Sequence, residues 1–289
     1  MGLIIGFVIV LAMVFGGYVL AGGKFDVILH ALPFEGMMIG GASIGSFIIA
    51  NSGSVMKKSL KGITKVMKGP VWKGQDYTDL LCLLSEISKL YKQKGPIGIE
   101  PHIENYKESE IFQRYPKIMH DHFAIDLICD SFRMITMDLN DPHQIEDVIS
   151  RQIKKHHHEA AAPAGALQTM SDGLPAIGIV AAVLGVIKTM SSIDKPPTIL
   201  GAMIGGALVG TFLGVFLSYC LVGPIASRLN QIIDEEGAFY NVIKDVIVSL
   251  MHGYSPVVAV ETGRGSVPSA MQPSFYELEM AMKELPPAK

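Results

Sequence analysis

The sequence lacks the patterns that mark the common enzyme and nucleic-acid-binding classes. No Ser-His-Asp order, nucleophile elbow or dinucleotide fingerprint occurs in its 289 residues. The net charge is −3, and no basic stripe is interleaved with aromatic side chains, which argues against a nucleic-acid-binding surface. We therefore expect neither an enzyme nor a nucleic-acid-binding protein.

Metal-ligand and disulfide spacings are also missing. The three cysteines, Cys82, Cys129 and Cys220, form no Cys-x-x-Cys pair, and we interpret them as reduced thiols. The consecutive histidines of the segment 156–158 point to different sides of a helix, and no second cluster completes a tetrahedral site. We interpret them as part of a solvated linker, and we expect no metal and no cofactor.

Charged side chains are scarce, at 18% of the residues, below the ~25% usual for soluble domains. None occurs between Pro196 and Ser227. Two apolar runs, Leu174–Ile187 and Thr198–Ile225, lie on either side of a short polar link. The second run exceeds the roughly 20 residues that cross a bilayer, and the first reaches that length with its flanking residues. The pair predicts a membrane hairpin.

Two further apolar runs precede this hairpin. Leu3–Gly23 carries no charge and no preceding basic residue, so we interpret it as an uncleaved spanning helix. Phe34–Ala50 follows after the link Lys24–Pro33 and is expected to span as well. Glu35 and Asp172 fall at the expected ends of spans, where Asp172 suits a helix N-cap. The sequence thus predicts four spans with no ionisable side chain near the bilayer middle.

Small residues recur in the predicted spans at intervals of four. Gly206, Gly210 and Gly214 share one face of the last span, where another helix backbone can come close. The second span repeats this spacing in two glycine pairs, Gly36 with Gly40 and Gly41 with Gly45. The pattern favours tight helix packing.

The remaining chain is polar and shows helical periodicity. Asp79–Tyr91 places its leucines on one face, and Gly95-Pro96 is expected to end that helix. Ile118–Leu139 and Ser274–Leu285 are predicted as further helices. We expect an all-α polytopic membrane protein whose parts are spans one and two (1–50), a helical cytoplasmic domain (51–171), spans three and four (172–227) and C-terminal cytoplasmic helices (228–289).

Basic residues predict the orientation. Five lysines crowd between residues 57 and 68, just after the second span, and Arg228 follows the fourth. Because Lys and Arg concentrate on the cytoplasmic side, both polar blocks and both termini are expected there.

A membrane ion pathway normally needs an ionisable group in mid-membrane, so a partner would have to supply it. Thr211 is the best polar group to line such a path, although its hydroxyl could equally bond back to its own helix. Pro175 and Pro224 lie near one membrane face of spans three and four, a plausible hinge pair.

These residues resemble a known family. The stretches 172–182 and 209–224 look like the third and fourth helices of the MotA family of flagellar motor stator subunits, within the MotA/TolQ/ExbB proton channels. Similar segments occur at 14–18, 45–47, 108–112, 253–256 and 273–279, in the same order along the chain. The resemblance extends over essentially the whole chain.

The resemblance implies a function. A pentamer of such subunits would surround two copies of MotB, whose membrane helix carries the proton-binding aspartate, in the bacterial inner membrane. Proton flow would turn the pentamer and exert torque on the rotor protein FliG. The family's hinge prolines fall on Pro175 and Pro224, and its rotor-contact charges on Lys92 and Glu100, with lysine in place of the usual arginine. Ala182, where sodium-driven relatives tend to have threonine, favours protons over sodium in a path that includes Thr211.

Three other functions compete with this one. An ExbB- or TolQ-like energy transducer shares the channel architecture but normally has three spans. A secondary transporter would need broken helices and a polar site at mid-membrane in paired repeats, which the sequence lacks. A membrane scaffold without conduction is the third alternative.

Overall fold

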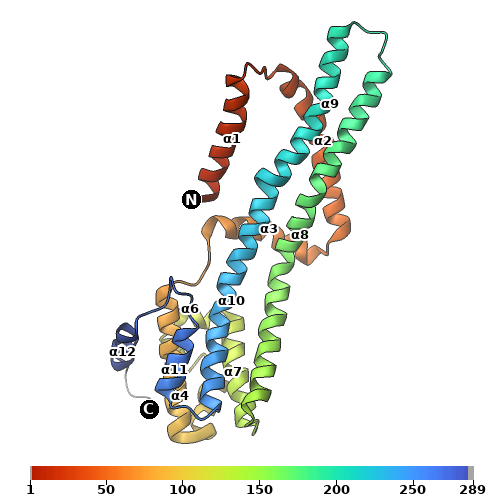
Figure 1. Cartoon of the computed structure of the whole chain (residues 1–289). Coiled ribbons are helices and arrows are strands. Elements are labelled where there is room, and N and C mark those ends of the chain that lie inside the picture. Colours follow the sequence, from red (N-terminus) through yellow and green to blue (C-terminus); the bar gives the residue numbers. More distant parts are fainter. Residues whose placement is uncertain (1, 286–289) are drawn as a thin grey trace. The chain divides into compact units, whose positions relative to one another are not determined.

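The computed structural model describes residues 2–285, and every regular element in that range is helical (Figure 1). This confirms the all-α prediction. The elements are α1 (Gly2–Leu20), α2 (Asp26–Ala50), α3 (Gly53–Lys68), α4 (Gly74–Glu104), α5 (Glu110–Gln113), α6 (Pro116–Met119), α7 (His122–Thr136), α8 (Pro142–Met190), α9 (Pro197–Leu217), the π-helical turn η1 (Ser218–Val222), α10 (Gly223–Met251), α11 (Pro256–Gly265) and α12 (Phe275–Lys283).

Four helical stretches of the described chain are long and apolar enough to cross a membrane, as predicted. They are α1, α2, a part of α8 and the run that begins with α9. Many of their large apolar side chains face outward, and Leu20 and Ile49 are 90% and 88% exposed. Such surfaces are rare on soluble monomers and fit contact with lipid or with other helices. The chain is a multi-pass membrane protein.

The second span differs from the prediction. The helix α2 begins at Asp26, eight residues before the expected start at Phe34, and Pro33 lies inside it. Glu35 is therefore well inside a span and is buried. Our placement of Glu35 at a span end was wrong, because the apolar residues between Asp26 and Pro33 continue the helix.

The third span is one part of a continuous helix. The helix α8 runs through Pro163 and Pro175 without interruption. Asp172 lies in its interior, and its carboxylate accepts a hydrogen bond of 2.8 Å from the Gln168 amide. The expected N-cap role of Asp172 was wrong, since no helix begins there.

The chain forms two compact units. One combines the residues up to Gly69 with Ala160–Ile232, and it contains the spans and α3. The other combines Pro70–Glu159 with Ile233–Lys289. The functional division of the chain at residues 50, 171 and 227 stays a prediction.

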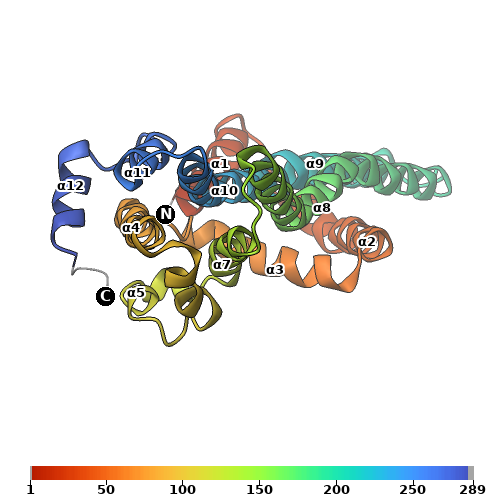
Figure 2. The ribbon, with the colours of Figure 1, turned by 90° about the horizontal axis from the view of Figure 1, so that it is seen from below.

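The second unit has a dense apolar core. The predicted apolar face of Asp79–Tyr91 lies in it, with Leu80, Leu83, Leu84, Ile87 and Leu90 each at most 1% exposed. Residues of α7, α8, α10 and α11 complete this core; Figure 2 shows the ribbon of these helices from below. The chain's single tryptophan, Trp72, stacks on Phe239 with ring centroids 3.9 Å apart.

One predicted helix is split in the structure. Instead of a helix over Ile118–Leu139, α6 ends at Met119 and α7 begins at His122. Asp121 causes the new start, because its carboxylate accepts a hydrogen bond of 2.8 Å from the Ala124 N–H and caps α7.

A buried carboxylate lies in this core with two partners. The Glu86 side chain is 3% exposed and pairs with the guanidinium of Arg114. Tyr115 donates a hydrogen bond of 2.9 Å to the same carboxylate. Burial and the nearby Glu86 charge raise the pKa of Tyr115, so its hydroxyl stays protonated and remains a donor. The carboxylate is thus compensated by a charge and by a hydrogen bond.

The three cysteines are free, as predicted. Burial, helped by nearby Asp79 and Glu86, raises the pKa of Cys82 to about 12. Burial also raises the pKa of Cys129 to about 12. Both thiols therefore stay protonated near neutral pH and are poor nucleophiles.

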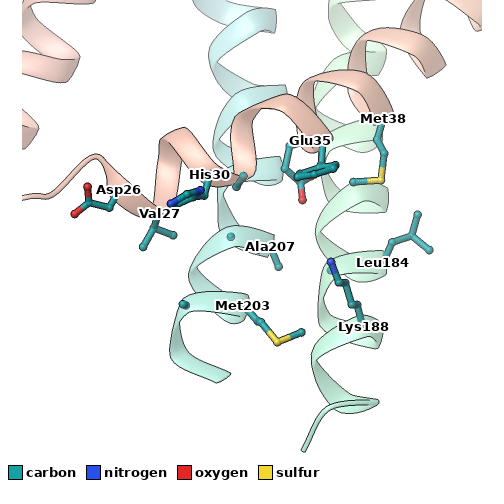
Figure 3. Close-up of a pocket in the computed structure, with 14 residues that line it drawn as sticks. Asp26, Val27, His30, Glu35, Met38, Leu184, Lys188, Met203 and Ala207 are labelled. Atoms are coloured by element: carbon teal, nitrogen blue, oxygen red, sulfur yellow. The ribbon is translucent and has the colours of Figure 1, made fainter. Parts of the chain in front are cut away.

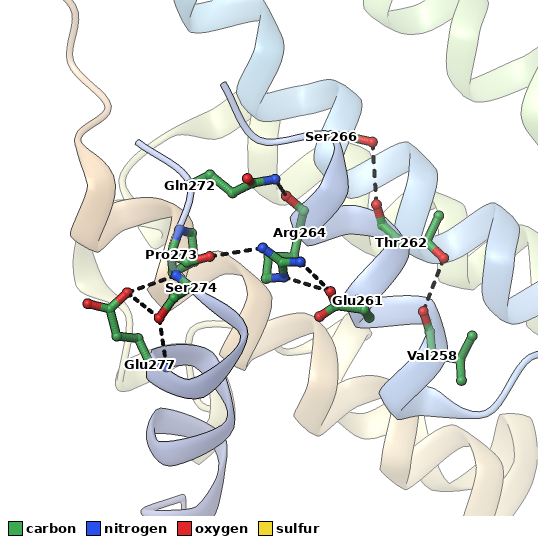
Figure 4. A network of polar contacts seen from close by, with 9 residues as sticks. All are labelled: Val258, Glu261, Thr262, Arg264, Ser266, Gln272, Pro273, Ser274 and Glu277. Carbon is green, nitrogen blue, oxygen red and sulfur yellow. Dashed lines mark hydrogen bonds and ion pairs between the residues drawn. The ribbon is translucent and has the colours of Figure 1, made fainter. Parts of the chain in front are cut away.

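Polar contacts hold the C-terminal segment (Figure 4). The Arg264 guanidinium binds Glu261, with a shortest distance of 2.5 Å, and donates to the Pro273 carbonyl at 3.1 Å. Ser274 caps α12 and exchanges hydrogen bonds with Glu277 in a capping box. These bonds to the Ser274 backbone and hydroxyl lower the pKa of Glu277. The short helix predicted from the sequence is thus confirmed.

Candidate functional site

The helices α8 and α9 come into backbone contact within the first unit. A Cβ atom added to Gly214 of α9 would lie 2.7 Å from the Leu174 carbonyl oxygen and 2.9 Å from the Gly178 Cα. One added to Gly178 would lie 2.8 Å from the Gly210 carbonyl oxygen. Only glycine fits at such distances, because the atoms that would clash belong to the backbone. The close approach predicted from the glycine spacing of the last span is confirmed.

The stripe of small residues on α9 also contacts α2. A Cβ at Gly206 would meet Ala31 of α2 at 3.7 Å, and one at Gly210 would meet the Glu35 carboxylate. The glycines predicted to pack α2 behave differently. Added Cβ atoms at Gly36, Gly40, Gly41 and Gly45 would meet nothing within 4 Å in the described chain. That these glycines of α2 pack against another helix stays a prediction, and that helix would have to belong to another chain.

The two predicted ion-path residues lie near this contact. The backbone nitrogen of Ala182 lies 3.3 Å from the Cβ position of Gly210, the residue that precedes Thr211. Both Ala182 and Thr211 are half-buried. Within the described residues the Thr211 hydroxyl makes no hydrogen bond, so the bond back to its own helix is not seen. The polar group is available to other partners.

The two predicted hinge prolines lie beside a polar link between α8 and η1. Ser171, four residues before Pro175, donates a hydrogen bond of 3.0 Å to the Ser218 carbonyl, and both serines are buried. The N–H of Gly223, the residue before Pro224, bonds to the same carbonyl across five residues. This π turn changes the hydrogen-bond register of the helix next to Pro224. Such turns are rare and often occur at functional sites.

The two predicted rotor-contact residues lie on α4, on either side of a break. Gly95 has φ +71°, a conformation that favours glycine, and it interrupts the helix as predicted. Lys92 precedes the break and Glu100 follows it, and both are exposed. Neither makes an ion pair within the described residues, so both charges are available for a partner.

Sequence reasoning missed three features of this site. Glu35 was assigned to a span end, and the run Val27–Leu29 before it was the signal that the helix begins earlier. The Ser171–Ser218 bond and the π turn had no signal, because both depend on how two helices meet. Among the described residues, no group of three or more His, Cys, Asp or Glu side chains could hold a metal ion.

Comparisons with known proteins agree with the helix arrangement. Residues 4–95 match the family described as Motility protein A N-terminal, and residues 117–241 match the MotA/TolQ/ExbB proton channel family. Motility protein A of Salmonella typhimurium is 40% identical over 277 residues, which are 96% of this chain and 93% of that protein. Chemotaxis protein LafT of Vibrio parahaemolyticus is 32% identical over 97% of this chain and 98% of that protein.

Two solved structures share the fold. The structure of C. jejuni MotAB superposes with a TM-score of 0.70 over 92% of this chain and 95% of that chain, at 19% identity. The flagellar MotAB stator complex from Bacillus subtilis gives a TM-score of 0.67 at 22% identity, over 89% of this chain and 92% of that chain. With the glycine-packed spans and the nearly full-length relatives, these matches show that the chain belongs to the MotA family of flagellar motor stator subunits, within the MotA/TolQ/ExbB proton channel family.

Proposed function

We propose that this stator subunit assembles in the bacterial inner membrane with a MotB-type partner and couples proton flow to torque on the rotor protein FliG. The observation that carries the proposal is the glycine contact between α8 and α9, which lies beside Ala182 and Thr211. The partner's membrane helix would bring the proton-binding aspartate. The relatives solved as MotAB complexes support such a partner.

The finer assignments belong to the same proposal. A pentamer would surround two partner copies, with both termini in the cytoplasm, and the lysines between residues 57 and 68 favour this orientation. Ala182 and Thr211 would line the ion path, and the absence of a side-chain oxygen at Ala182 favours protons over sodium. The exposed charges Lys92 and Glu100 would contact the rotor.

The coupling ion can be tested by swimming. The chain is expressed with its cognate partner in a strain without stators, and sodium and the proton gradient are varied separately. We expect swimming to be restored and then lost with a protonophore at any sodium concentration. Swimming that follows sodium would overturn the proton assignment. No rescue, with both proteins present in the membrane, would contradict the stator function itself.

The hinge predicts a specific loss of function. A proline inside a helix leaves the carbonyl four residues earlier without its hydrogen bond, and alanine restores that bond and stiffens the helix. Pro175→Ala and Pro224→Ala are expected to assemble with the partner but to abolish swimming, measured by co-purification and by swimming speed. Pro163→Ala, which changes the other proline inside α8, is the matched control and should swim. Normal swimming of both hinge variants would exclude the hinge.

A further inference from the structure

The carboxylate of Glu35 has an unusual position for a side chain of a membrane span. It extends from α2 toward α9 and α8 (Figure 3), and the residue is only 6% exposed. Its Oε2 atom is buried and has no hydrogen-bond partner in the described structure. A Cβ at Gly210 would lie 2.5 Å from this oxygen, so the glycine leaves the space that the carboxylate occupies.

An unpaired carboxylate is costly at such a place. An ionised carboxylate that loses water without gaining a partner is strongly destabilised, so the group holds a proton or a cation. Ionisable side chains inside membrane spans are rare and mark ion or proton routes more often than structural roles. A purely structural contact would be served as well by an apolar side chain. The Glu35 carboxylate therefore needs a bound proton or cation to neutralise its charge.

A cavity gives this carboxylate access to water. It has a volume of about 630 Å³ and lies between α2, α8 and α9, where it is lined by 14 residues that include Glu35 (Figure 3). A space of this size with polar groups in its wall can hold several water molecules. The other titratable groups that line it are Asp26 and His30 of α2 and Lys188 of α8, all exposed, while α9 contributes none.

The composition of the cavity points to a proton rather than a metal ion. Hard cations bind through several oxygen ligands, and here only one buried carboxylate is present. No group of three metal-ligating side chains occurs among the described residues. A proton needs a single oxygen and water to deliver it. A Cβ at Gly210 would lie 2.5 Å from the carboxylate and 3.3 Å from the Ala182 backbone nitrogen, so the carboxylate lies near Ala182, a residue proposed to line the ion path.

We propose that Glu35 is a proton-binding residue of this chain, which accepts protons from water in the cavity and releases them at the α8–α9 contact beside Ala182 and Gly210. In each step a hydronium ion transfers its proton to a carboxylate oxygen, and the carboxylic acid later returns it to a water molecule or to an acceptor on the partner. The proposal rests on the proposed proton coupling, in which the partner's aspartate is the next acceptor.

Infrared difference spectroscopy tests proton binding without requiring conduction. Spectra are recorded on the purified complex of the chain with its partner between about pH 6 and about pH 8, where ordinary exposed carboxylates stay ionised. The partner's membrane aspartate is replaced by asparagine, which removes its signal. A carbonyl-stretch band of a protonated carboxylic acid is expected in this complex and should disappear in Glu35→Gln. Asp172→Asn, which changes an exposed carboxylate of α8, should keep the band.

Swimming then tests whether the bound proton lies on the route. Glu35→Gln is expected to nearly abolish swimming, because the loss of a proton-transfer group costs about 10²–10⁴-fold in rate, while Glu35→Asp retains most of the speed. Co-purification with the partner checks that the variants assemble. If Glu35→Gln does not assemble, the proposal is tested by the infrared spectrum of the wild-type chain in complex with the asparagine-substituted partner. Absence of the carboxylic-acid band from that spectrum overturns the proposal.

The remaining outcomes are also decisive. A band that persists in Glu35→Gln, or that responds to sodium at constant pH, overturns proton binding at Glu35. Unchanged swimming of Glu35→Gln overturns its place on the proton route. Failure of the wild-type chain to restore swimming would contradict the stator proposal, and the infrared band would still report on Glu35 independently.

Discussion

Replacing Gly214 by alanine is expected to separate α8 from α9 and to abolish swimming. The added methyl group would lie 2.7 Å from the Leu174 carbonyl oxygen and 2.9 Å from the Gly178 Cα. These are backbone atoms and cannot move aside as a flexible side chain does, so the helices must move apart. Overpacking of this kind costs about 1–3 kcal/mol. The melting temperature and yield of the purified complex, together with swimming, measure the loss.

A control in the same helix separates this clash from general effects of alanine. A Cβ at Gly201 would meet nothing within 4 Å in the described chain, so Gly201→Ala should not lower the melting temperature. Alanine also stabilises helices relative to glycine, so the Gly201 variant sets the baseline. Equal melting temperatures for the two variants would show that the helices do not approach as closely as the structure places them.

Removing Arg114 should destabilise the second unit strongly. Arg114→Ala leaves the buried Glu86 carboxylate with only the Tyr115 hydroxyl as a partner. Loss of one member of a buried ion pair costs about 3–5 kcal/mol, because the other charge stays desolvated. Thermal unfolding of the purified chain, followed by the fluorescence of Trp72, measures the effect. Trp72 is 2% exposed and stacks on Phe239, so its emission changes when this core unfolds.

Arg133 provides the matched control for this prediction. Its guanidinium pairs with Glu104 and Asp130, but all three side chains are well exposed. Exposed ion pairs contribute about 1 kcal/mol or less, so Arg133→Ala should lower the melting temperature only slightly. If Arg114→Ala and Arg133→Ala have the same melting temperature, the ion pair between Arg114 and Glu86 contributes no more to stability than a surface ion pair.

Much of the fold could be predicted because lipid imposes simple rules. The absence of charge over 196–227 and the length of the other apolar runs indicated four spans, and the described residues contain four helical stretches that could cross a membrane. The spacing of Gly206, Gly210 and Gly214 indicated a close contact, because residues four apart share a helix face. The break at Gly95 could be predicted because glycine followed by proline seldom continues a helix.

The site was harder to predict because it depends on helix starts and on contacts between helices. Pro33 suggested that α2 begins after it, but Pro33 lies within the helix, and this moved Glu35 from a span end to the interior. Local periodicity contains no information on the π turn of Ser218–Val222, which appears only where α9 meets Ser171 of α8. The roles of Lys92 and Glu100 depend on a partner and stay predictions.

The protonation of the buried thiols has a practical consequence for labelling. Maleimide dyes react with accessible thiolates, and Cys82 and Cys129 are both buried and held in the thiol form. Cys220, the remaining cysteine, is half-buried and lies within the π turn. A dye that reaches a thiol of the native chain should therefore attach to Cys220 rather than to Cys82 or Cys129. The unmodified sequence thus carries a single attachment point for a fluorescent reporter, four residues from Pro224.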